Sequence, residues 1–129
     1  MAEENIWGDL KGAAASIKTP ASILKEQAAQ LGPATGFMLI GQVDVETEGR
    51  TAIRIDLDVR VPALNDYLIT LLRCRHTLDL YPVEVTSSYS EMEDTNCQDA
   101  VELLAVVKEH VRSKGVQKVL QSLLAQAKS

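Results

Sequence analysis

The sequence contains few of the residues that build disulfide frameworks, stacking platforms or basic surfaces. Two cysteines among 129 residues give no disulfide framework, so we expect both to be reduced thiols. One tryptophan, three tyrosines and one phenylalanine are too few and too scattered for a nucleic-acid stacking platform. The net charge is −5, whereas nucleic-acid binders carry a basic patch or stripe. These shortages argue against a nucleic-acid-binding protein.

Long apolar runs are also missing. No stretch approaches the roughly 20 apolar residues that span a bilayer, so we predict no membrane partner. The acidic start is not followed by an apolar segment, so we expect no secretory signal and predict a cytoplasmic protein. The apolar content of 46% is near the average of globular proteins, and the length suits one domain.

Two stretches alternate between apolar and polar residues in the way typical of half-buried strands: 41–47 and 53–61. Antiparallel partners point to the same face of a sheet, so the apolar odd-numbered positions must face one another. This requirement predicts a hairpin with an odd number of loop residues. A three-residue loop over 47–49 ends on a glycine, which accepts a left-handed backbone, and it pairs Val43 with Ile53.

Pro62 follows the hairpin and predicts both the end of the second strand and the start of a helix. The helix is expected over 62–76, because leucines recur at the helical spacing i, i+4, i+7 and i+8. Residues 80–89 alternate again and predict a third strand. The sequence leaves open whether this strand pairs with the first strand or the second.

The remaining segments predict helices. Thr19-Pro20 opens a helix that Gly32-Pro33 closes, and residues 113–115 separate two C-terminal helices that follow a polar connector over 87–96. We therefore predict an α+β fold: a small, mainly antiparallel sheet, made of a β-hairpin plus a third strand, covered by helices. The predicted order is α-β-β-α-β-α-α. Residues 19–129 form the single domain, and residues 1–18 form a flexible N-terminal arm.

The arm carries a small apolar cluster made of Ile6, Trp7 and Leu10. Large apolar side chains are rarely left in water, which favours docking of Trp7 on its own domain. A tryptophan on a tether also suits docking on a partner or on a second copy of the chain. The sequence is compatible with both alternatives.

Four amphipathic helices offer more apolar surface than one face of a three-stranded sheet hides. We therefore predict a non-enzymatic protein-interaction module of the adaptor, chaperone-like or inhibitor type, which associates with a protein partner or with itself as a homo-oligomer. The predicted interface consists of the Trp7 arm and a stripe on the last helix: Val116, Leu120, Leu123 and Leu124. No catalytic residue, metal ligand or cofactor is predicted.

The alternative is a small enzyme or ligand-binding domain with a pocket between sheet and helices. Its polar lining is predicted near the start of the third strand, from Arg75, His76, Tyr81 and Tyr89. A shifted histidine pKa in such a cleft would favour this alternative.

Three other groups of residues offer candidate chemistry or contacts. Cys74, His76, Cys97 and His110 match a zinc ligand set by number alone, without the spacing of a zinc motif. Pairing of Cys97 with a histidine as nucleophile and base is opposed by the acidic residues around that thiol. The alternating charges of residues 54–60 suit a solvated sheet face, or else a charge-patterned docking face.

Overall fold

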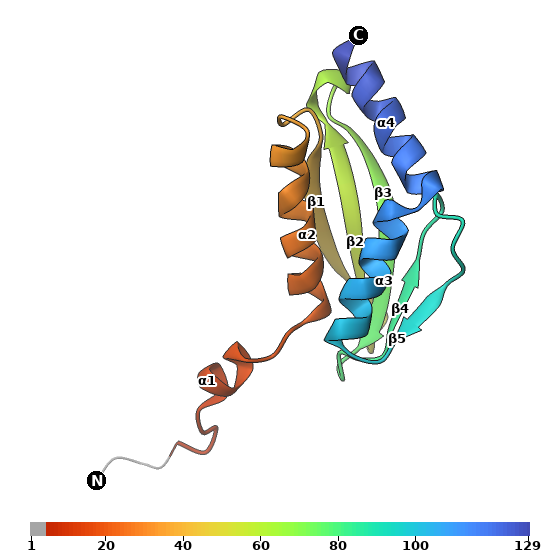
Figure 1. Ribbon diagram of the computed structural model, residues 1–129. Coiled ribbons are helices and arrows are strands. Elements are labelled where there is room, and N and C mark those ends of the chain that lie inside the picture. Colours follow the sequence, from red (N-terminus) through yellow and green to blue (C-terminus); the bar gives the residue numbers. More distant parts are fainter. Residues whose placement is uncertain (1–4) are drawn as a thin grey trace.

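A five-stranded antiparallel sheet forms the centre of the structure, a computed structural model that describes residues 5–129 (Figure 1). Each strand pairs with the next one along the chain. The strands are β1 (Ile40–Glu48), β2 (Ala52–Val61), β3 (Tyr67–Thr77), β4 (Val83–Thr86) and β5 (Thr95–Cys97). The predicted α+β class with an antiparallel sheet and helices is confirmed.

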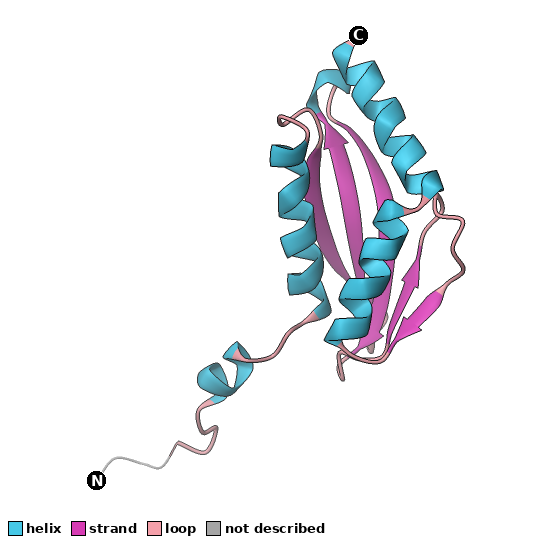
Figure 2. Cartoon of the chain, viewed as in Figure 1, coloured by secondary structure: helices cyan, strands magenta, loops and turns pink. Residues whose placement is uncertain are grey.

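Helices cover one face of this sheet. Figure 2 shows α2, α3 and α4 on the same side of the strands, whereas α1 lies apart in the N-terminal segment. The helices are α1 (Leu10–Ala15), α2 (Pro20–Ala34), the 3₁₀ turn η1 (Pro62–Leu64), α3 (Ala100–Arg112) and α4 (Lys114–Lys128). Within residues 5–129, no helix has the length and apolar character needed to cross a bilayer.

The β1–β2 hairpin has the predicted faces but a different register. Glu48 pairs with Ala52, which leaves a three-residue loop over 49–51, and Val43 lies opposite Leu57 instead of Ile53. The odd loop length and the left-handed Gly49 (φ +64°) are as predicted. The loop moves by two residues because β1 continues through Glu48, and the partner of each β1 residue moves by four, an even number, so the apolar positions still share one face.

The helix predicted over 62–76 is wrong. Only the 3₁₀ turn η1 is helical, and β3 follows it directly. Asn65 and Asp66 both have a left-handed backbone, at φ 58°, and they turn the chain back so that β3 pairs with β2. A break in register between Leu57 and Asp58 leaves one extra residue on β3, which is a β-bulge.

The third predicted strand corresponds to β4, and it pairs with neither strand of the hairpin. Its partner is β3, the segment that the sequence assigned to a helix. The polar connector contains a further strand, β5, which completes the sheet beside β4. The sheet therefore has five strands where the sequence indicated three, and it offers a correspondingly larger apolar face to the helices.

Side-chain caps begin the three long helices. Thr19 Oγ1 accepts a hydrogen bond from the Ser22 amide at 3.1 Å, which begins α2 as predicted. The Asp99 carboxylate caps α3 by accepting from the Glu102 amide at 2.9 Å. Ser113 caps α4, so α3 and α4 meet at the predicted break.

The predicted interface on α4 assumed a sheet too small to cover the helices, and the five-stranded sheet is larger than that. Val116, Leu120 and Leu123 of α4 are buried in the common core, and Leu124 is half-buried against it. Their own chain already covers these side chains. The predicted surplus of apolar surface on the long helices, and with it the α4 stripe as an exposed interface, was therefore wrong.

Candidate functional site

A groove of about 380 Å³ lies between α2 and α3, with the sheet as its floor. We call it the α2–α3 groove. Its walls are mostly apolar and include Leu31 from α2 and Val107 and Val111 from α3. Leu57, Val59 and Leu71 of the sheet form its floor. Its volume falls at the lower end of the roughly 300–1,000 Å³ typical of ligand sites.

Small side chains on α2 explain why the groove exists. Ala28 and Ala34 line it on the α2 side, and their short side chains fill little of the space. Gly41 of β1 sits directly under α2, because a Cβ atom at this position would overlap the carbonyl oxygen of Ala28. The helix therefore packs closely on β1, and the space that remains is on its α3 side.

The rim of the groove carries amides and positive charges. Gln27 and Gln30 border it from α2, and Lys108 and Arg112 border it from α3. Both cations are exposed, and neither forms an ion pair with a carboxylate within residues 5–129. An apolar floor under an unpaired cationic rim suits an occupant with an apolar body and an acidic group.

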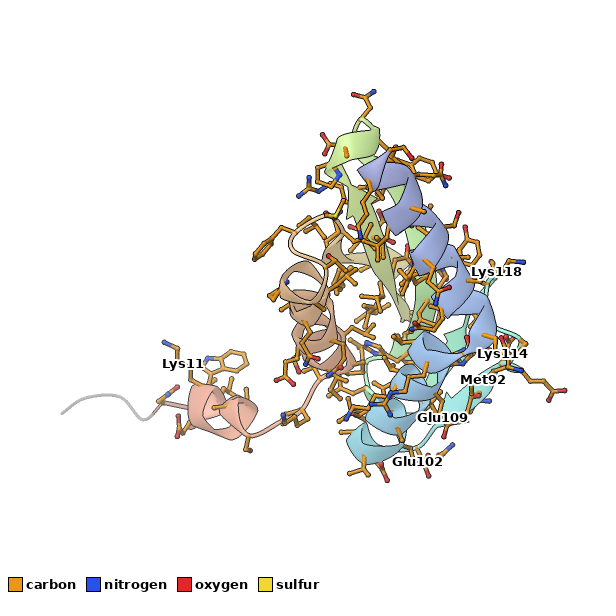
Figure 3. The ribbon with its side chains drawn as sticks, turned by 45° about the horizontal axis from the view of Figure 1, so that its top comes forward. Lys11, Met92, Glu102, Glu109, Lys114 and Lys118 are labelled. Atoms are coloured by element: carbon orange, nitrogen blue, oxygen red, sulfur yellow. The ribbon has the colours of Figure 1, made fainter. Side chains whose placement is uncertain are left out.

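The labelled charges of α3 and α4 lie elsewhere. In Figure 3, Glu102 and Glu109 on α3 and Lys114 and Lys118 on α4 occupy the side turned away from α2, and none of them borders the groove. The connector that carries Met92 lies beside them. Its Glu91 carboxylate accepts the amide hydrogens of Lys114 at 3.0 Å and Gly115 at 2.9 Å, which fixes the connector at the start of α4.

The uncovered face of the sheet carries charges that pair with one another. Arg73 Nε donates to Asp56 Oδ1 at 2.8 Å, and Arg75 Nε donates to Glu48 Oε2 at 3.1 Å. Arg54 forms ion pairs with Glu46 and Glu48 of β1 and with Asp56 of its own strand. Charges already paired within the chain have less to offer a partner, so this pattern favours the solvated-face interpretation over the docking face.

Asp58 has the least favourable environment for a charged carboxylate on this face. Burial raises its pKa, and the neighbouring charges of Asp56 and Asp44 act in the same direction. The hydrogen bond from Thr70 Oγ1, at 2.7 Å, opposes the rise. The carboxylates of Asp44, Asp56 and Asp58 therefore lie near one another, and the Thr70 hydroxyl is the hydrogen-bond donor to Asp58.

The pocket predicted from Arg75, His76, Tyr81 and Tyr89 is not formed, because these residues do not converge. Arg75 and His76 are neighbours on β3 and point to opposite faces of the sheet. The Tyr81 hydroxyl donates to the Lys18 carbonyl at 3.0 Å, and the Tyr89 carbonyl lies against the α4 start, where a Cβ on the glycine at 115 would overlap it. A space between sheet and helices does exist, but it is the α2–α3 groove.

The two cysteines are free thiols buried in the core. Burial raises the pKa of Cys74 to about 12 and that of Cys97 to about 11. Thiols with such pKa values are poor nucleophiles near neutral pH, which counts against the pairing of Cys97 with a histidine. No cluster of three metal-binding side chains occurs within residues 5–129.

The N-terminal arm is exposed over its described part, residues 5–18. Trp7 is 70% exposed, and Ile6 and Leu10 are also uncovered, so Trp7 does not dock on its own domain here. Lys11, labelled in Figure 3, lies on α1 well away from the sheet. The first four residues of the predicted arm lie outside the described part of the chain.

No protein-family model, curated protein or solved structure matches this chain. The groove is also a feature that the sequence reasoning missed. Its signal in the sequence was the small residues Ala28 and Gly41, of which Ala28 is buried and has its backbone directly against Gly41.

Proposed function

We propose that the protein is a non-enzymatic protein-interaction module that holds an apolar segment of polypeptide in the α2–α3 groove. The observation that carries the proposal is an apolar space between two helices, floored by the sheet and bordered by unpaired cations. Peptide segments that lie in grooves between helices are anchored by a few large apolar side chains. The groove volume, about 380 Å³, suits one or two anchors of this kind.

The positive charges on the rim favour a segment that carries acidic residues. Lys108 and Arg112 stand on the same side of the groove, one helical turn apart on α3. Acidic residues that flank an apolar anchor would meet these cations while the anchor fills the space below. Exposed pairs of this type contribute little affinity and mainly set orientation, so the apolar anchor provides most of the binding energy.

A second candidate function is binding of an amphipathic small molecule, such as a long-chain carboxylate. The same observation favours it, since its hydrocarbon tail matches the apolar floor and its head group matches Lys108 and Arg112. The two candidates differ in the length of groove that the occupant requires. A carboxylate needs one cation, whereas a peptide also contacts the amide rim of Gln27 and Gln30.

The groove can be tested with anilinonaphthalene sulfonate, a dye with an apolar ring system and an anionic group. At low protein concentration we expect saturable fluorescence enhancement by the wild-type chain. Val111→Arg places a charge in the groove and should weaken dye binding at least about tenfold. Val101→Arg is the matched control, since Val101 is on the same helix, 80% exposed and outside the groove.

Equal dye binding by both variants would exclude the groove as the site. Competition then separates the two candidates. Displacement of the dye by an acidic peptide with an aromatic anchor, but not by dodecanoate, supports the interaction module. Displacement by dodecanoate alone supports the small-molecule alternative.

A further inference from the structure

The N-terminal arm carries apolar side chains that nothing in the described chain covers. Ile6 is 86%, Trp7 70%, Leu10 61% and Ile17 53% exposed. All hydrogen bonds of residues 5–17 within the described chain stay inside that segment. Four large apolar residues are therefore exposed within twelve positions, and large apolar side chains are rarely left in water in such number.

The arm and the groove are complementary in chemistry. The groove offers an apolar space and the unpaired cations Lys108 and Arg112. The first 17 residues contain three acidic residues, Glu3, Glu4 and Asp9, against one basic residue, Lys11. Trp7 lies between these carboxylates in the sequence and is an aromatic anchor of the kind that dominates binding in such grooves.

The base of the arm directs it away from its own groove. The Lys18 carbonyl accepts a hydrogen bond from Tyr81 at 3.0 Å, and the Lys18 ammonium lies 3.8 Å from the Glu26 carboxylate. In Figures 1 and 3, α1 lies beyond the start of α2, on the side away from α3, so the arm lies outside the groove of its own chain. This placement favours the groove of another molecule.

We propose that the arm of one chain docks in the α2–α3 groove of a second copy, with Trp7 as the anchor. This inference rests on the proposed function, because it names the segment that the groove holds. Each copy has one arm and one groove, so a two-fold arrangement forms both contacts at once and closes as a dimer. The partner of this interaction module is then the chain itself, through its arm rather than through α4.

Trp7 is the sole tryptophan, so its fluorescence reports on the arm alone. The experiment measures tryptophan emission and molar mass by light scattering on the full chain across micromolar concentrations. We expect the emission to move to shorter wavelength and the mass to double over the same concentration range. The dimer dissociation constant should rise at least about tenfold in Trp7→Ala and in Val111→Arg. Val101→Arg should match the wild type.

Three results would overturn the inference. A blue-shifted emission that is independent of concentration, with the mass of one chain, would place the arm in its own groove. A monomer with exposed tryptophan at every concentration would leave the arm without this role. A dimer that Trp7→Ala and Val111→Arg do not weaken would assemble through another surface.

The dye titration keeps this inference distinct from the proposed function. If Val111→Arg loses dye binding while the wild type stays monomeric, the groove is a binding site and only the arm is the wrong occupant. If dye binding is unchanged in Val111→Arg, the groove itself fails. At a protein concentration at which the wild type is dimeric, Trp7→Ala should bind more dye than the wild type, because its groove is not occupied by an arm.

Discussion

Replacement of His110 by leucine should stabilise the protein. The imidazole is fully buried on the inner face of α3, and within residues 5–129 neither ring nitrogen has a hydrogen-bond partner. A buried polar group without a partner costs about 1–3 kcal/mol, whereas an apolar side chain of similar size does not. We expect His110→Leu to raise the free energy of unfolding at pH 7.5 by about 1–2 kcal/mol, which corresponds to roughly 3–8 °C in Tm.

The same side chain makes stability depend on pH. Burial lowers the pKa of His110, although the carboxylates of Glu109, Asp94 and Glu91 oppose the shift. The unfolded chain takes up a proton as pH falls through about 6.5, while the folded chain does not until its lower pKa is reached. His110 therefore makes the wild type less stable as pH falls below about 6.5, by up to ~1.4 kcal/mol per pH unit until the lowered pKa is reached.

Denaturant unfolding of the wild type, His110→Leu and His110→Gln between pH 5.5 and 7.5 separates the two effects. The glutamine variant retains a buried polar group but cannot titrate, so it should lose the His110 contribution to the pH slope without the gain in stability at pH 7.5. A leucine variant that is less stable than the wild type by more than about 1 kcal/mol would refute the reasoning. It would mean that the imidazole has partners in the folded protein.

One labelling measurement and two substitutions test other parts of the structure. Cys74 and Cys97 should react with a disulfide reagent at least about 100-fold more slowly in the folded chain than in urea, because burial raises both pKa values and blocks access. Gly41→Ala should lower the free energy of unfolding by about 1–3 kcal/mol, because the added methyl group overlaps the α2 backbone at Ala28. Asp58→Asn should stabilise the protein at pH 7, since the raised pKa means that ionised Asp58 opposes folding, and the gain should disappear below about pH 4. Each is measured by thiol labelling kinetics or by denaturant unfolding against the wild type.

The hairpin and the starts of α2 and α4 were predictable because each depends on local chemistry, whereas α2 runs through the predicted stop at Gly32-Pro33 and ends at Ala34. Thr19 and Ser113 cap their helices through bonds to amides three residues away. The parity of the β1–β2 loop followed from the strict alternation of two short runs. The exact register did not, because it depends on how far β1 extends toward the ion pairs of Glu48 with Arg54 and Arg75.

The β3 segment was misassigned because its β-bulge breaks the period of two. The extra residue shifts the apolar positions, so Leu68, Leu71 and Leu72 fall at spacings that also suit a helix face. Two signals pointed the other way. Asn65-Asp66 is a dipeptide that tolerates the left-handed backbone of a tight turn, and residues 72–76 alternate in the manner of a strand. One wrong element changed the whole estimate of sheet area, and the predicted α4 interface depended on that estimate.

The groove shows why a site of this kind escapes sequence reasoning. In the sequence, alanine at positions 28 and 34 indicates only a good helix former. That these positions border a groove depends on the distance between α2 and α3, which the sequence does not specify. Leu31 of α2 and Val107 and Val111 of α3 line the same space. The apolar side chains that line this open groove remain in contact with water, so an occupant that covers them would gain free energy from their burial. The exposed arm, with one tryptophan and flanking acids, is the occupant that we propose.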